Sequence, residues 1–337
     1  MSTKRLGFFS RILDDTSAGE RYRLATEQIT HAERFGFDSA WVAQHHFHGA
    51  EGGLPSPLVF LANVAAQTSS IRLGTGIITL PLENPIRVAE DAAVLDLLSG
   101  GRLEIGLGTG GTPSSFTTFG LESAARSEIF GEHFQVLLDA WGGNPINGGE
   151  NRLYPASPQL LDRIWQATFS AGGATRAGQR GDGLLLSRTQ PRSADAPNAT
   201  LSDIQNPIID AYLDNLPSGA TPRILGSRTL FVADSRDEAR AFAHKGLVAS
   251  RNALRGMGQG TDSDDLDELI ATFDVHVGTP DEVAESLAAD TALARVTDVA
   301  FQVHSVDPPH EHILRSIELT ATTVAPALGW KQELARA

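Results

Sequence analysis

The strongest constraint on the fold is an alternation of short apolar runs with longer segments whose apolar residues recur at helical spacing. Such alternation is typical of parallel strands joined by helical crossovers. About eight βα units are present, so we predict an α/β fold, an eight-stranded (β/α) barrel, with an open doubly wound sheet as the rival. The predicted strands are 5–9, 39–45, 71–80, 102–110, 163–169, 183–187, 223–233 and 298–304.

No linker or shift in composition divides the chain, so residues 1–337 are predicted to form a single barrel domain. Two segments interrupt the alternation and are predicted to be insertions. Residues 188–222 are rich in Pro, Asn, Asp and Ser, and are either a functional lid or a solvated loop. Residues 254–275 are rich in Gly and Asp, and we interpret them as a solvated loop.

Composition excludes several classes of function. The chain has no cysteine, which rules out disulfides, thiolate metal sites and cysteine nucleophiles. Its formal net charge is −14, which disfavours nucleic acid and anionic membranes as partners. No apolar run approaches the ~20 residues that span a bilayer, and the N-terminus lacks the pattern of a signal peptide. We therefore expect a cytoplasmic protein.

Three histidines follow the second predicted strand, in "QHHFH" at 44–48. In a barrel, active-site residues lie at the carboxyl ends of strands, so His45 is predicted to act as a general base or as a hydrogen-bond donor to a ligand. His46 fits a functional or a packing role equally, and His48 is interpreted as a packing residue. His46 and His48 could ligate a metal, but only His304 ends another strand, so no metal site is predicted.

Glycines lie in or next to two other predicted strands. "GLGTGG" at 106–111 matches the dinucleotide pattern G-x-G-x-x-G, but it follows the fourth predicted strand and leads into "TPSSFTTFG", which we predict to be a loop. We interpret these glycines as room for a flat ligand against the backbone. Gly76 interrupts the strand 71–80, which indicates a bulge or a close backbone approach.

An anion site is predicted in "TFSAGGATRAG", at 168–178. Ser170, Gly172 and Gly173 begin a short helix whose free N–H groups suit a phosphate. Arg176 either adds charge there or points to solvent. A flexible glycine turn is the alternative interpretation of the segment.

Taken together, "AERFGFDSAWVAQHHF", "IRLGTGIITLPLENPIRVAEDAAVLDLLSGGRLEIGLGTG" and "GDGLLLSR" resemble the bacterial luciferase-like flavin monooxygenases. The resemblance runs from about residue 5 to 328, and is greatest to members described as FMN-dependent. It implies that His45 is the catalytic histidine, which assists the oxygen chemistry of the flavin. It also implies a non-proline cis peptide at Gly76-Ile77, packed against the flavin ring. The cofactor-binding residues predicted on all these grounds are Gly76, Ile77, Thr109, Ser170, Gly172, Gly173, Ser187 and Arg188.

The chain departs from the family pattern at two positions. Gln44 stands where most relatives have a glutamate, so proton handling near the histidines is expected to differ. Thr109 stands where luciferase has an arginine that binds phosphate, so the phosphate is expected to be held more by backbone amides.

The resemblance implies a monooxygenase that uses reduced FMN and molecular oxygen to oxygenate a small organic substrate. A separate NAD(P)H-dependent reductase would supply the flavin, and a homodimer is expected. Two alternatives stay open: a deazaflavin-dependent enzyme that transfers hydride, and a non-catalytic flavin-binding protein. The sequence singles out no charged residue that would select a substrate.

Overall fold

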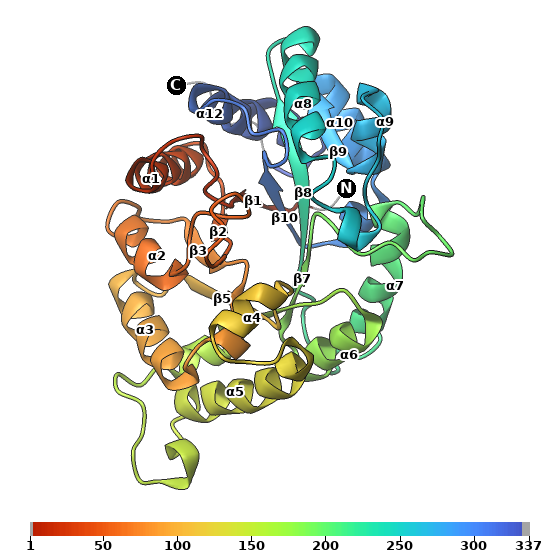
Figure 1. Cartoon of the computed structure of the whole chain (residues 1–337). Helices are drawn as coiled ribbons and strands as arrows, with labels where there is room; N and C mark the ends of the chain where they lie inside the picture. The colour runs from red at the N-terminus through yellow and green to blue at the C-terminus, as the bar shows by residue number, and fades with distance from the viewer. Residues whose placement is uncertain (1–2, 332–337) are drawn as a thin grey trace.

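The computed structural model describes residues 3–331. Within this range, parallel strands form a closed eight-position barrel that is surrounded by helices (Figure 1). Closure comes from pairing of the last strand with both the first strand and the strand before it in the ring. The predicted barrel is therefore confirmed. In ring order the strands are β1 Arg5–Ser10, β2 Ser39–Val42, β3 Arg72–Thr75 with β4 Ile78–Thr79, β5 Leu103–Gly108, β6 Ile164–Ala167, β7 Gly183–Leu186, β8 Ile224–Val232 and β10 Asp298–Gln302.

The helices pack on the outside of this barrel and connect successive strands (Figure 1). The main ones are α1 Ala18–Arg34, α2 Pro57–Ala65, α3 Pro85–Leu98, α5 Arg126–Trp141, α6 Ala171–Arg180, α7 Leu201–Leu213, α8 Arg236–Ser250, α10 Pro280–Ala289 and α12 His310–Leu319. Several begin as their sequences indicate. Asn84 accepts hydrogen bonds from the backbone N–H groups of Ile86 and Arg87, and Pro85 occupies the first position of α3.

Two tryptophans fill the interior of the barrel. Trp41 and Trp165 meet edge to face, with ring centroids 5.5 Å apart. Each ring lies over a glycine of a neighbouring strand, Gly74 beside Trp41 and Gly183 beside Trp165, where a Cβ atom would overlap the indole. The two indole rings therefore require glycine at these positions. Because the tryptophans fill the interior, the candidate site lies above them, at the carboxyl ends of the strands.

The two predicted insertions contact each other. Residues 188–222 contain α7, and residues 254–275 contain the short helix α9, Leu266–Thr272. Asp274 joins them: its carboxylate pairs with Arg192 and accepts hydrogen bonds from the backbone N–H of Leu201 (3.0 Å) and from Gln259 Nε2 (3.2 Å). The segments therefore form one connected structure rather than two independent loops.

The structure corrects part of the sequence interpretation. "TPSSFTTFG" is not wholly a loop, because Pro113–Thr118 forms the short helix α4 with proline at its first position. The segment 254–275 is not wholly a solvated loop either, because it contains α9. Other elements that were not predicted are β9 Val275–Gly278, which pairs with β8 outside the ring, then α10 and α11 Thr291–Arg295. Within residues 3–331 the helices are all too short or too polar to cross a membrane.

Candidate functional site

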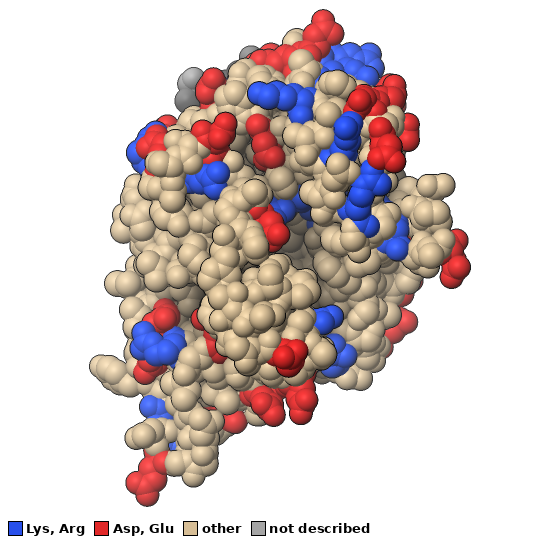
Figure 2. Space-filling view, in the orientation of Figure 1, with Lys and Arg blue, Asp and Glu red and all other residues tan. Residues whose placement is uncertain are grey.

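The carboxyl ends of the strands bring together side chains that are distant in the sequence. Arg11 directly follows β1, His45 follows β2, and Arg188 and His304 each follow their strands, β7 and β10, by two residues. A hollow opens near the centre of the face drawn in Figure 2, and basic atoms are visible inside it. We call the group Arg11, His45, Arg188 and His304 the mouth cluster.

His45 is held by Arg11. The guanidinium Nη2 lies 3.1 Å from His45 Nε2, and because a guanidinium only donates, Nε2 accepts and the neutral ring carries its proton on Nδ1. Nδ1 faces Gly52, where a Cβ atom would overlap the imidazole. Burial, and then the positive charge of Arg11, lower the pKa of His45 to about 3. His45 is therefore neutral at physiological pH.

The two arginines of the mouth cluster have no acidic partner. Among residues 3–331, neither Arg11 nor Arg188 forms an ion pair, although Arg188 is only 5% exposed. Arg188 Nη1 donates to Thr229 Oγ1 (3.2 Å), and Arg11 donates to His45 and to the carbonyl oxygen of Glu51. Burial, and then the charge of Arg11, lower the pKa of Arg188 to about 9.

His304 contacts an acid near the cluster, Asp307. Its Nδ1 lies 2.7 Å from Asp307 Oδ2, and its carbonyl oxygen accepts from Thr229 Oγ1 (2.7 Å), the hydroxyl that Arg188 also contacts. Burial and the charge of Arg188 lower the pKa of His304 to about 4, although Asp307 acts in the opposite direction. The carboxylate of Asp307 thus forms its hydrogen bond with a histidine and not with an arginine.

His46, the residue after His45, forms an aromatic group with Phe47 and Phe119. The ring of His46 meets that of Phe119 edge to face at 5.0 Å, and Phe47 lies 5.7 Å from Phe119. Phe47 is 62% exposed and Phe119 44% exposed. His48 turns elsewhere and lies 3.0 Å from Ser114 Oγ. The described residues contain no group of three or more potential metal ligands.

The backbone at Gly76 provides a flat surface beside the mouth. The Gly76-Ile77 peptide bond is cis, as the resemblance implied. A Cβ atom at Gly76 would lie 2.5 Å from the ring of Phe9, and one at Gly108 would lie 2.9 Å from Ile77 Cδ1. Thr109 follows β5 directly and is partly buried. A side chain at either glycine would therefore overlap a neighbouring side chain, and the interpretation of these glycines as room for a flat ligand stays a prediction.

The predicted anion site is the N-terminus of α6. Ser170 is its N-cap and accepts from the backbone N–H of Gly173 (3.2 Å), while Gly172 is exposed. A side chain at Gly173 would overlap Thr168. Because the first N–H groups of a helix lack intrahelical partners and carry partial positive charge, this end of α6 suits a phosphate. Arg176 is exposed one turn further along.

The remaining predicted residues lie where β7 ends. Ser187 Oγ accepts from the backbone N–H of Thr189 (3.3 Å), and its carbonyl oxygen accepts from Gln205 Nε2 of α7 (2.7 Å). Gln190 is fully buried, and neither its amide nitrogen nor its amide oxygen has a protein partner within the described range. Sequence reasoning missed Arg11 and Gln190, although the rule of strand ends would have found Arg11.

Gln44 turns away from the histidines. Its Nε2 donates to Glu83 Oε1 (2.6 Å) and to the carbonyl oxygen of Pro55 (3.0 Å), and its Oε1 accepts from the backbone N–H of Thr79 (2.7 Å). Burial raises the pKa of Glu83. The side chain that the replacement of glutamate by Gln44 affects directly is therefore that of Glu83.

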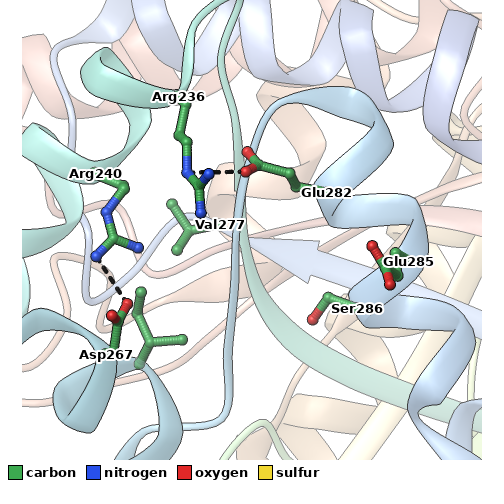
Figure 3. A pocket seen from close by; sticks show the side chains of 8 residues that line it. Arg236, Arg240, Asp267, Val277, Glu282, Glu285 and Ser286 are labelled. Carbon is green, nitrogen blue, oxygen red and sulfur yellow. Dashed lines mark ion pairs between the residues drawn. The ribbon is translucent and has the colours of Figure 1, made fainter.

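A second pocket, of about 360 Å³, lies outside the barrel between α8, α9 and α10 (Figure 3). It also contains two arginines, but each faces a carboxylate. Arg236 Nε lies 3.0 Å from Glu282 Oε1, and Arg240 Nη2 lies 2.8 Å from Asp267 Oδ1. Its cations are therefore compensated, unlike those of the mouth cluster.

Comparisons with known proteins agree with this architecture. The 4-hydroxyprotoasukamycin monooxygenase of Streptomyces nodosus subsp. asukaensis is 30% identical, covering 90% of this chain and 89% of the relative. The oxygenase component of the flavin-dependent trigonelline monooxygenase of Acinetobacter baylyi is 26% identical over 70% of this chain and 66% of its own. The crystal structure of monooxygenase RslO1 from Streptomyces bottropensis superposes with a TM-score of 0.81 at 25% identity, covering 96% of this chain and 99% of the other.

Several relatives are monooxygenases, one of them described as flavin-dependent, while others are F420-dependent glucose-6-phosphate dehydrogenases. The family model described as luciferase-like monooxygenase matches residues 6–297. That match spans the barrel from β1 to the residue before β10. The chain therefore belongs to the luciferase-like monooxygenase family.

Proposed function

We propose that the protein is a flavin-dependent monooxygenase that uses reduced FMN and molecular oxygen to oxygenate a small organic substrate. The observation that carries the proposal is one barrel mouth combining a phosphate-type helix terminus at Ser170, a flat backbone surface at Gly76-Ile77 and a neutral buried histidine, His45. Monooxygenases among the relatives support it, one of them described as flavin-dependent.

Each part of the mouth has a proposed task. Reduced FMN, when bound, supplies the electrons that activate oxygen. The N-terminus of α6, with Ser170, Gly172 and Gly173, holds the phosphate, and Thr109 and Ser187 flank the cofactor. Gly76 and Ile77 support the ring. These residues fit the cofactor for two reasons. The α6 terminus offers N–H groups without intrahelical partners, and the space beside Gly172 is open to a phosphate.

His45 is proposed to accept or return a proton at Nε2. That atom receives a hydrogen bond from Arg11, so the guanidinium has to shift before Nε2 takes a proton. The connected segments 188–222 and 254–275 are proposed to cover the mouth and exclude water. We further propose that a separate reductase delivers the flavin, as the description of one relative as an oxygenase component suggests.

A homodimer is also proposed. Val94, Leu97 and Leu98 of α3 are exposed at i, i+3 and i+4 spacing, which places them on one helix face. Light scattering should give twice the mass of the chain, and Leu98→Asp should shift it toward the monomer. A monomeric wild-type protein would refute this proposal.

F420-dependent relatives make hydride transfer the second candidate. An anaerobic titration with reduced FMN and with reduced F420, followed by mixing with air, separates the two. We expect tighter binding of FMN, and oxygen consumption by the bound flavin. Preference for F420 without oxygen consumption would replace the monooxygenase by a hydride-transfer enzyme. Binding of a flavin with no change in its reaction with oxygen would indicate a binding protein.

A further inference from the structure

The mouth cluster contains two arginines that no ion pair within residues 3–331 neutralises. The charge of Arg11 acts on Arg188, and the charge of Asp307 acts on both in the opposite direction. Neither arginine forms an ion pair with a carboxylate among the described residues, however. The chain has 41 acidic residues against 27 basic ones, so acids are abundant elsewhere. A buried cation without a partner is costly, which makes its presence at a ligand site informative.

The arginines also keep unused donors. A guanidinium has five N–H groups, and Arg188 uses only Nη1, on Thr229. Arg11 Nε is buried and has no protein partner. Gln190, two residues after Arg188, adds a fully buried amide whose nitrogen also has no partner in the described chain. Planar guanidinium groups match the two oxygens of a carboxylate or a similar oxyanion.

The phosphate of the proposed cofactor is assigned elsewhere, because the α6 terminus follows β6 and contains neither arginine. His46 follows His45 of the mouth cluster in the sequence, and its ring packs with the exposed ring of Phe119, which in turn packs with that of Phe47. An apolar or aromatic body therefore fits beside the cationic groups.

We propose that Arg11 and Arg188 bind the acidic group of the substrate, which is an organic anion with an apolar or aromatic body resting on Phe47 and Phe119. This assigns Arg188 to the substrate instead of the cofactor, and as a substrate assignment it rests on the proposed monooxygenase function. The acidic group of the substrate would give the two guanidinium groups the carboxylate partner that no residue within 3–331 provides.

The test compares benzoate with benzamide, a neutral probe of similar shape. Each is titrated calorimetrically into the full-length protein with oxidised FMN, so no turnover occurs. We expect benzoate to bind on the order of 10-fold more tightly than benzamide, because a charge-assisted pair with arginine is involved. Arg188→Met should abolish this preference. Arg87→Gln, in the exposed ion pairs of α3, is the matched control and should retain it.

Equal binding of the two probes, no binding of benzoate, or an unchanged preference in Arg188→Met would overturn the inference. Reduced FMN is titrated into the same variants: loss of FMN affinity in Arg188→Met, with benzoate binding intact, would return Arg188 to the cofactor. If Arg188→Met does not fold, Arg188→Gln takes its place. If the wild-type protein binds no flavin at all, the proposed function fails, but a benzoate preference in the free protein would still establish the anion site.

Discussion

Arg188 and Arg228 are both buried arginines of the barrel wall, and they differ in what surrounds them. Arg228 lies in β8, and its guanidinium contacts Asp290 through Nε (2.6 Å) and Nη2 (3.2 Å). Arg188 lies after β7 and has no carboxylate partner in the described chain. Although burial alone would raise the pKa of Asp290, Arg228 brings it down to about 2. Arg102, another buried arginine, donates to several carbonyl oxygens and to the hydroxyl of Thr68. The comparison indicates that the fold gives a structural cation several acceptors, whereas Arg188 donates to one hydroxyl among the described residues.

Removing the acid of the compensated pair should have the largest effect. Asp290→Ala leaves Arg228 buried without a partner, so the free energy of unfolding should fall by ~3–5 kcal/mol. Urea denaturation measures it. Asp262→Asn removes the acid of an exposed ion pair with Arg255 and should change stability by no more than about 0.5 kcal/mol. Similar effects of the two substitutions would contradict the structural role of Arg228–Asp290.

Acidification should affect both regions. The pKa values of His276, beside Arg228, and of His304, beside Arg188, are each lowered to about 4, mainly by burial, so protons bind first to the unfolded chain as the pH falls below ~6.5. Each histidine should therefore reduce the free energy of unfolding by about 1.4 kcal/mol per pH unit down to about pH 4. Denaturation at several pH values should show a shallower decline for His276→Gln and His304→Gln than for the wild type; an unchanged slope would refute the pKa assignment.

Gln44→Glu would place two acids next to each other without a cation between them. The new carboxylate would replace the amide that now donates to Glu83, and a buried carboxylate would meet a half-buried one. One must then take up a proton, which should lower the free energy of unfolding by ~1–3 kcal/mol at pH 8 and by less at pH 5, where protonation is easier. Thermal unfolding at both pH values measures this. Gln67→Glu, at an exposed position just after α2, is the control and should show no such pH dependence.

The smallest expected effect is a gain in stability. Arg188→Met removes a buried charge with no acidic partner, so the free energy of unfolding should rise by ~1 kcal/mol, as measured by urea denaturation without ligand. Arg87→Met, at an exposed position, should change little. Destabilisation by Arg188→Met would show that the guanidinium supports the fold, and the contrast with Arg228 would then disappear.

The barrel was predictable because its strands are buried on both faces and read as continuous apolar runs. Helix starts were also readable, as at Asn84 and Pro85, since capping is local chemistry. The helix at Pro113–Thr118 was missed because six residues rich in Ser and Thr have weak helical preference by themselves. β9 is short, and its pairing with β8 is a tertiary contact that no local pattern reveals.

The candidate site was predictable where one strand end contributes a recognisable side chain, as with His45, and less so where partners come from distant segments. Arg11 and His45 are 34 residues apart in sequence, and Arg188 meets Thr229 from 41 residues away. No spacing rule relates such pairs. Whether a charge is compensated depends on all surrounding elements together, so the contrast between Arg188 and Arg228 needed the three-dimensional structure.

Asp274 has a consequence for anyone who re-engineers this scaffold. Because it contacts Arg192, Leu201 and Gln259, the segments 188–222 and 254–275 share one anchor. Transplanting either segment alone from a homologue would leave half of that anchor behind. Loop-swap libraries that aim to change what the enzyme accepts should therefore exchange both segments as one cassette, with the aspartate retained.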